Sequence, residues 1–132
     1  MTSIRRVTSP DAPEPPPERW SNCLVVGDVA YISGATSRAT ATEGLLDDYQ
    51  QAKKIFTKIK ALVEAAGGDM ADVVKVGIFV TDIRRREQVW RARAEFFSGD
   101  FPASTLVEVS KLADPEVTVE IEAIAHIGAS KA

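Results

Sequence analysis

Two acidic residues, Glu120 and Glu122, stand in an otherwise apolar stretch near the end of the sequence, which reads VTVEIEAIAHI from Val117 to Ile127. Apolar residues recur at every second position, as in a β-strand with one buried face. The opposite face of such a strand carries both carboxylates. If that face lines a cleft or a subunit contact, burial and mutual repulsion can keep one carboxyl group protonated near neutral pH, as acid–base chemistry requires. If it meets bulk water, the pair needs no functional explanation.

Other kinds of catalytic centre find little support. The only histidine is His126, which excludes a site with several histidine ligands and disfavours a serine–histidine triad. We expect it at the surface or at an interface. The only cysteine is Cys23, so an intrachain disulfide is excluded, and we expect a packed thiol and not a nucleophile. The residues therefore predict no metal site.

Length and composition indicate one globular domain. The chain has 132 residues, of which 45% are hydrophobic and 27% are charged, as is ordinary for a soluble protein. The net charge of −3 gives no reason to expect nucleic-acid binding, although residues 84–86 are three arginines in a row. The N-terminus lacks the apolar run of a signal peptide, and no segment approaches the length of a membrane span. We expect a cytoplasmic protein that binds neither nucleic acid nor membranes.

The first part of the chain predicts an edge strand, an arm and a hairpin. Residues 3–7 suit an edge strand, and five of the seven prolines follow in SPDAPEPPPERW, residues 9–20, which cannot join a helix or a central strand. This arm could be a mobile flap or an ordered strap. In LVVGDVAYISG, two apolar runs flank a two-residue turn with glycine first, so residues 24–26 and 29–33 are expected to pair antiparallel.

An amphipathic helix is predicted over residues 43–66, where apolar residues alternate at steps of four and three from Leu45 to Ala66. Thr40 with Glu43 resembles a capping box, and Thr42 is an equally good cap. Gly67-Gly68 supplies the stop.

The next segment, DVVKVGIFVTD, alternates as a strand that buries Val74, Val76, Ile78 and Val80. A second helix over 85–98 and strands over 105–109 and 117–127 complete the order (β)ββαβαββ. This is an α+β domain with a mixed six-stranded sheet and two helices on one face. We expect residues 1–19 to form the strand and arm, 20–128 the domain, and 129–132 a tail.

Two helices leave the opposite sheet face uncovered, including Phe79 and Tyr31. A large apolar face with no layer over it predicts self-association, with clefts at the subunit boundaries.

Four segments, in order and spacing, resemble one family. WSNCLVVGDVAYISG resembles its opening Y-S-x-A-x-x-x-G-x-x-x-x-x-S-G, and LVEAAGGDMADVVKVGIFVTD its centre L-x-A-A-G-x-x-x-x-D-V-V-K-x-x-x-F-x-x-D. AEFFSGDFPAST resembles A-E-F-F-x-x-x-x-P-A-R-S/T, and VEIEAIA matches the last strand. From about Trp20 to Ala125 the chain thus resembles the RidA/YjgF family of reactive-intermediate deaminases. The resemblance implies a chorismate-mutase-like fold and a homotrimer with sites between subunits. It also implies hydrolysis of imines or enamines to ketones and ammonia, without metal or organic cofactor.

The chain departs from the family at Ser104. In the family, an arginine of P-A-R-S/T holds the substrate carboxylate, and a glutamate of the last strand positions or activates the water. Ser104 stands in place of that arginine, so a bidentate cation is replaced by a neutral hydroxyl group. Arg91 or Arg93 of the second helix could replace the missing charge, whereas Glu120 keeps the place of the glutamate.

Other departures make the expected pocket more aromatic. Trp20 replaces the usual tyrosine, Ala35 a common glutamine, and Trp90 a polar residue of the second helix. Glu120 is the expected catalytic residue, with backbone N–H groups near Gly34, Ala35 and Thr105 orienting a carbonyl or carboxylate. The expected substrate-binding residues are Trp20, Ser33, Gly34, Ala35, Trp90, Ser104, Thr105 and Glu122. Structural alternatives are interface ion pairs for the glutamates, packing for the tryptophans, and a strand-start hydroxyl group for Ser104.

Two functions remain open. The first is hydrolytic deamination of an enamine or imine larger than a 2-imino acid, such as an aminomuconate-like compound. The second is a non-catalytic small-molecule binder or chaperone-like trimer on the same scaffold. Endoribonuclease activity is disfavoured, because the chain is acidic and has no pair of histidines.

Overall fold

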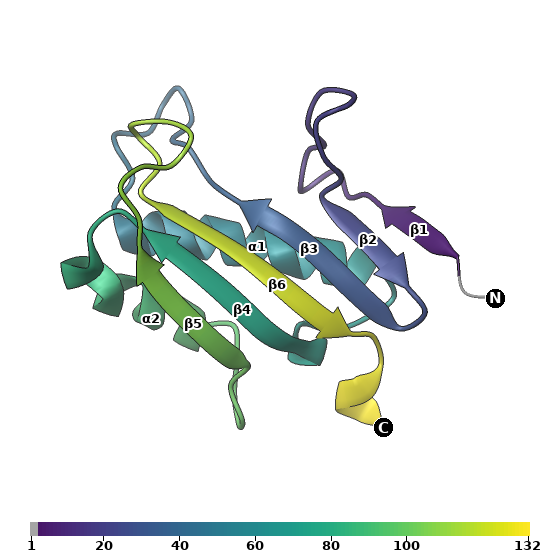
Figure 1. Ribbon diagram of the computed structural model, residues 1–132. Coiled ribbons are helices and arrows are strands. Elements are labelled where there is room, and N and C mark those ends of the chain that lie inside the picture. The colour runs from purple at the N-terminus through teal and green to yellow at the C-terminus, as the bar shows by residue number, and fades with distance from the viewer. Residues whose placement is uncertain (1–2) are drawn as a thin grey trace.

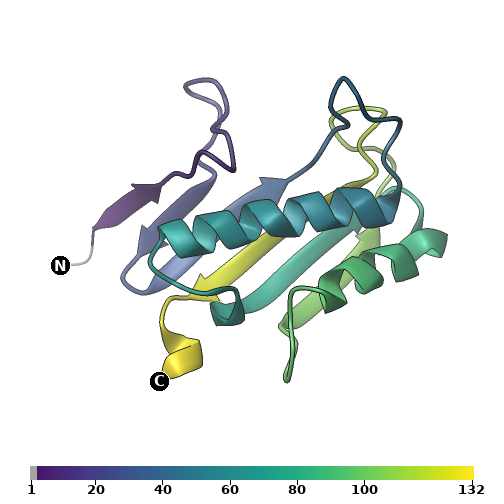
Figure 2. The same cartoon turned by 180° about the vertical axis from the view of Figure 1, so that it is seen from behind.

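The computed structural model describes residues 3–132 and contains one six-stranded sheet with two helices on one face (Figures 1 and 2). The strand order is β1-β2-β3-β6-β4-β5. The strands are β1 (Ile4–Val7), β2 (Cys23–Val26), β3 (Val29–Ala35), β4 (Val73–Val80), β5 (Ala103–Glu108) and β6 (Val119–His126). The helices are α1 (Asp48–Ala65) and α2 (Arg86–Ala94), with short 3-10 turns η1 (Met70–Asp72), η2 (Ile83–Arg85) and η3 (Ala129–Lys131).

The sheet is mixed, and its last strand lies in the middle. β6 pairs antiparallel with both β3 and β4, whereas β4 and β5 are parallel neighbours joined through α2. The predicted fold class, element order and N-terminal hairpin are confirmed. Gly27 at the hairpin turn has φ 60°, a left-handed conformation that glycine adopts without strain. The central position of β6 places Glu120 and Glu122 between neighbouring strands on both sides.

Helix α1 begins later than the sequence pattern predicts. It starts at Asp48, because the Asp47 carboxylate accepts the N–H of Gln50 at 2.8 Å while the Gln50 side chain accepts the N–H of Asp47. Neither predicted threonine cap is used. Leu45, which extends the apolar periodicity toward residue 43, lies in the preceding loop and is 77% exposed.

The core lies between α1 and the sheet. Phe56, Ile55 and Ile59 of α1 are fully buried against Ile78 and Ile121, which are the inward residues of β4 and β6. Each such side chain contributes about 1.5–3 kcal/mol by leaving water. The inward side chains of β6 thus anchor the strand, and its alternate residues face away from the helices.

A β-bulge changes the start of β4. The register against β6 shifts between Val73 and Lys75, so Val73 is buried and Val74 is 42% exposed. The prediction of Val74 on the core face is therefore wrong, whereas Val76, Ile78 and Val80 are buried as predicted.

Helix α2 ends at Ala94, four residues before the predicted end. The N–H groups of Glu95 and Phe96 bond three residues back, to Ala92 and Arg93, which tightens and closes the last turn. Phe96 and Phe97 still reach the core, with ring centroids 5.4 and 5.9 Å from that of Phe56.

The proline-rich arm is tied to the body of the fold. The Asn22 amide donates to the carbonyl groups of Ala12 (3.1 Å) and Pro13 (3.0 Å), and Ala12 is buried. Arg6 and Glu14 form an ion pair. In this structure the arm therefore has the contacts of an ordered strap.

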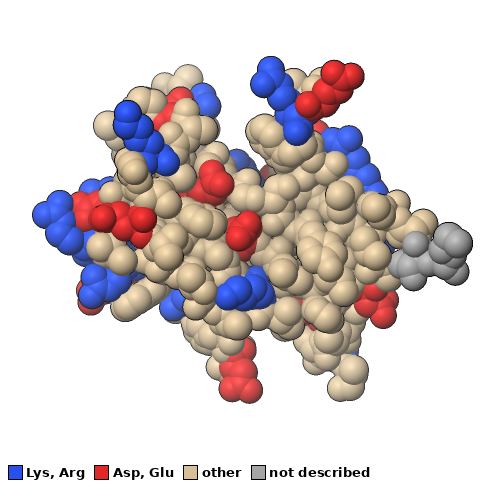
Figure 3. Space-filling model, in the orientation of Figure 1, with Lys and Arg blue, Asp and Glu red and all other residues tan. Residues whose placement is uncertain are grey.

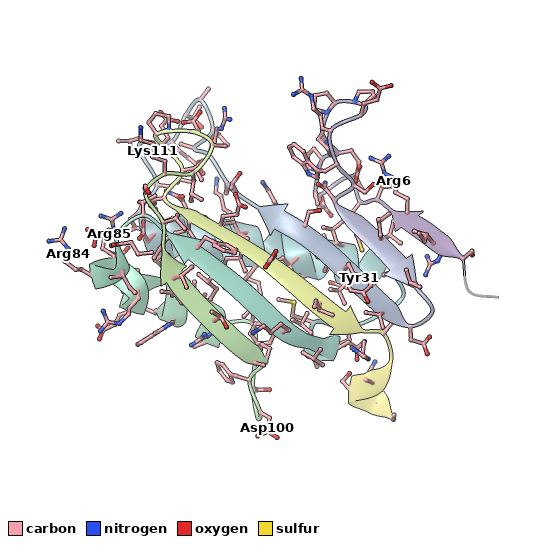
Figure 4. All side chains as sticks on the ribbon, in the orientation of Figure 1. Arg6, Tyr31, Arg84, Arg85, Asp100 and Lys111 are labelled. Carbon is pink, nitrogen blue, oxygen red and sulfur yellow. The ribbon has the colours of Figure 1, made fainter. Side chains whose placement is uncertain are left out.

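The sheet face opposite the helices is uncovered, as predicted. Tyr31, labelled in Figure 4, is 51% exposed on this face, and it pairs across the strands with Ile124. Figure 3 views the molecule from this side and shows few charged groups over its middle. Among residues 3–132 no helix has the length and apolar character to cross a membrane.

Candidate functional site

The carboxylates of Glu120 and Glu122 both lie against glycines of neighbouring strands. A methyl group added at Gly34 in β3 would lie 3.0 Å from Cδ of Glu120. One added at Gly77 in β4 would lie 2.8 Å from Oε1 of Glu122. Each carboxylate thus occupies space that only glycine leaves free on the helix-free face.

Burial and repulsion raise the pKa of Glu120 above the ordinary carboxyl value of 4.5. Loss of water around the side chain is the larger cause, and the negative charge of Glu122 adds to it. Among the described residues, no cation or hydrogen-bond donor compensates the Glu120 carboxylate. A half-buried, uncompensated carboxylate can hold or release a proton nearer neutral pH than an exposed one.

Next to Gly34 lies a small cleft that brings together four predicted substrate-binding residues. Its volume is about 160 Å³, and its lining includes Trp20, Ser33, Gly34 and Ala35. Trp20 is 55% exposed at this cleft. The Ser33 hydroxyl group donates to the Ser21 carbonyl at 2.5 Å. The lining comes from the arm, from β3 and from α1, and Glu120 is not part of it.

Lys58 also lines this cleft, and sequence reasoning missed it. Its ammonium group donates to the Thr36 carbonyl at 2.6 Å, and burial together with the charge of Lys54 lowers the pKa of Lys58. Lys58 precedes Leu62, another lining residue, by one helical turn. This spacing of four residues places both side chains on one side of α1, so the sequence alone could have placed Lys58 beside Leu62.

The predicted residues of β5 fall on opposite faces of the sheet. Thr105 pairs with Gly77, and its hydroxyl group accepts from Lys75 at 3.1 Å on the helix-free face. Ser104 pairs with the buried Val76, so its side chain lies on the helix side of this edge strand. Arg93 of α2 reaches it there, and Nη1 of Arg93 donates to Oγ of Ser104 at 3.0 Å.

Trp90 lies on α2, far from Trp20. It is exposed, and the Arg86 guanidinium carbon lies 5.6 Å from the centroid of its ring. Figure 2 shows α2 in front of β5 at one end of the sheet, with β1 and β2 at the other. The predicted aromatic pocket does not form from these two tryptophans within one chain.

The predicted site residues therefore form two groups in one chain. The first comprises Glu120, Glu122 and Thr105 on the helix-free face, and Gly34 connects it to the cleft lined by Trp20, Ser33 and Ala35. The second comprises Ser104 and Arg93 at the edge of the sheet, near α2. β4 separates the strands of Glu120 and Ser104, and the two side chains point to opposite faces.

Comparison with known proteins identifies the family. The family model described as Endoribonuclease L-PSP matches residues 10–127. The chain belongs to this family. The resemblance to RidA/YjgF proteins is also confirmed, because a structure of RidA from an Antarctic Psychrobacter is 31% identical with a TM-score of 0.81. The match covers 93% of this chain and 99% of that protein.

Two further relatives match over nearly their full length. A protein named 2-iminobutanoate/2-iminopropanoate deaminase from Dermatophagoides farinae is 36% identical over 96% of this chain and 99% of its own. A crystal structure of a Pseudomonas aeruginosa protein of unknown function is 42% identical, with a TM-score of 0.86 over 97% of this chain and 95% of its own.

Cys23 and His126 lie outside both groups. Cys23 is completely buried, as predicted, and burial raises the pKa of its thiol, so little thiolate forms near neutral pH. His126 is exposed on β6.

Proposed function

We propose that this protein is a hydrolytic deaminase of an enamine or imine, in which Glu120 positions and activates water at a site between subunits. The observation that carries the proposal is the uncompensated Glu120 carboxylate, which lies against Gly34 on the helix-free face. The deaminase name of the Dermatophagoides relative supports the reaction class.

The chemistry requires one group that accepts a proton and later returns it. Water attacks the carbon of the C=N bond and transfers a proton to the Glu120 carboxylate. The protonated Glu120 then donates to nitrogen, which gives a carbinolamine. Glu120 next transfers the proton of the carbinolamine hydroxyl group to nitrogen, the C–N bond breaks, and a ketone and ammonia leave. Proton transfer of this kind is worth about 10²–10⁴-fold in rate, most when the pKa of the group approaches the working pH.

A homotrimer accounts for the separation of the two residue groups. The edge of β5 in one subunit would meet the Glu120 face of its neighbour and bring the two groups together. The uncovered sheet face supports such association, because apolar surface left in water favours burial by another copy.

The expected substrate is larger than a 2-imino acid, and an aminomuconate-like compound is one example. Trp20 at the cleft offers an aromatic surface on which a conjugated or cyclic substrate can stack. The small side chain of Ala35 leaves room beside it.

The test is ammonia release from a panel of enamines and imines. Glu120→Gln keeps the size of the side chain and removes the base, so we expect the rate to fall about 100-fold or more. Glu64→Gln, an exposed site on α1, is the matched control and should keep the wild-type rate. Equal rates for Glu120→Gln and the wild type would contradict the catalytic role of Glu120.

A non-catalytic binder is the second candidate, and the serine at position 104 favours it. A neutral hydroxyl group holds a substrate carboxylate less firmly than an arginine does. Saturable ligand binding without ammonia release from any member of the panel would support this alternative.

A further inference from the structure

Arg93 carries a partly buried guanidinium group that forms no ion pair within residues 3–132. Its hydrogen bond to Ser104 is the one interaction with a polar side chain that it makes among the described residues, and its Nε is buried without a partner. By contrast, Arg38, Arg84 and Arg85 each pair with an aspartate.

The surroundings of Arg93 favour an anion. Its guanidinium carbon lies 6.0 Å from the centroid of the Phe101 ring, so an aromatic side chain lies on one side of it. Burial lowers the pKa of Arg93, because the charged form loses solvation that no carboxylate among residues 3–132 replaces. A ligand anion would offset this cost.

We propose that Arg93 and Ser104 together bind a carboxylate group of the ligand. The inference rests on the proposed function and specifies its substrate as a carboxylate-bearing enamine or imine. The Ser104 oxygen accepts from Nη1 of Arg93, which leaves the serine hydroxyl hydrogen free to donate. The ligand carboxylate would accept from Ser104 and from the remaining terminal N–H groups of Arg93.

Arg91, two residues earlier on the same helix, is already engaged. Its guanidinium carbon lies 4.2 Å from the centroid of the Tyr49 ring, and the Tyr49 hydroxyl group donates to Glu95. Arg91 and Arg93 therefore point to different neighbours, and Arg91 provides a matched control of equal charge.

The position of Arg93 also indicates which subunit supplies the Glu120 that acts on the ligand held by Arg93. Arg93 and Ser104 lie on the helix side of the sheet edge, whereas Glu120 of the same chain lies on the opposite face. The carboxylate held by Arg93 in one subunit would thus present its C=N group to Glu120 of another.

The experiment measures binding of stable probes by calorimetry. Benzoate and pyruvate are the carboxylate probes, and benzamide is the neutral control. We expect at least one carboxylate to bind the wild type, with benzamide at least tenfold weaker than benzoate where benzoate binds. Arg93→Gln should weaken carboxylate binding at least tenfold, whereas Arg91→Gln should leave it unchanged.

A rescue variant separates recognition from folding. The double variant Arg93→Gln with Ser104→Arg returns a guanidinium group to the same place from β5 and should regain most of the lost affinity. Circular dichroism should show the same folded signal for all variants. If neither carboxylate binds the wild type at millimolar concentration, or if Arg93→Gln and Arg91→Gln bind alike, the proposal is wrong.

Ammonia release distinguishes this result from that for the proposed function. Arg93-dependent binding without ammonia release would support the carboxylate site and contradict the proposed deaminase function. Ammonia release with the same KM for a carboxylate substrate in Arg93→Gln and in the wild type would support the deaminase and contradict the carboxylate site.

Discussion

The carboxylate of Glu120 lies over the backbone of Gly34 on the neighbouring strand, in space that any larger residue would fill. The position of the proposed base thus depends on a residue that has no side chain of its own. Gly34 also lines the adjacent cleft, so one residue affects both the base and the cavity.

Gly34→Ala should reduce activity much more than stability. The added methyl group meets the far end of the flexible Glu120 side chain, which can move at small cost in folding energy. A displaced base loses its alignment with the water, so we expect kcat to fall at least tenfold. Ammonia release and thermal unfolding measure the two effects separately.

Gly44→Ala is the matched control, because a methyl group there would meet no atom within 4 Å. It should keep the wild-type kcat. A Gly34→Ala protein with full activity would show that the position of the Glu120 carboxylate against Gly34 does not matter for catalysis.

Glu122→Gln should move the acid limb of the pH–rate profile to lower pH. The negative charge of Glu122 helps to raise the pKa of Glu120, so its removal lets Glu120 ionise, and act as a base, at lower pH. The shift should be partial, since burial is the larger cause and remains. A profile of kcat/KM against pH checks this, and a shift to higher pH would contradict the assigned coupling.

Glu120→Gln should increase the stability of the folded chain near neutral pH. The folded chain holds the Glu120 proton more tightly than the unfolded chain does, so ionisation favours unfolding as the pH rises above 4.5. The neutral amide escapes this effect. The gain in Tm over the wild type should therefore be largest near pH 7 and disappear below pH 4.

The fold could be predicted because its periodic segments agree with the structure. Steps of two in β6 and steps of three and four in α1 place the same residues inward that the core contains. The errors arise where local bonds override periodicity. Asp47 and Gln50 cap α1 and leave Leu45 in a loop, although their spacing of three is visible in the sequence. The bulge that exposes Val74 has no comparable sequence signal.

The candidate site could be predicted only in part, because its groups come from different elements. Alternation places Glu120 and Glu122 on one face, but it does not show that glycines of β3 and β4 make room for them. The contact between Arg93 and Ser104 joins a helix to an edge strand. Neither partner's local sequence fixes that contact, which depends on how α2 packs behind β5.

Tyr31→Glu should disrupt the proposed trimer. Tyr31 and its cross-strand partner Ile124 lie on the uncovered sheet face, where a buried unpaired charge would oppose association. Light scattering should give a mass near 14.3 kDa for the variant and about three times that for the wild type. Lys60→Glu, on the exposed side of α1, should remain associated. A wild-type protein that is monomeric at micromolar concentration would contradict the trimer.

Gln51→Leu should destabilise the fold, because Gln51 connects α1 to the start of β6. Its buried side chain accepts the N–H groups of Thr118 (2.9 Å) and Val119 (3.3 Å) and donates to the Glu116 carbonyl (3.2 Å). Leucine fills similar space but leaves these groups unpaired, at a cost of about 3–5 kcal/mol. Urea unfolding measures the loss, with Lys60→Leu on the exposed side of α1 expected within about 0.5 kcal/mol of the wild type. Since Val119 directly precedes Glu120, the folded fraction of the Gln51 variant should also have a lower kcat. A loss below about 1 kcal/mol would show that water replaces these bonds.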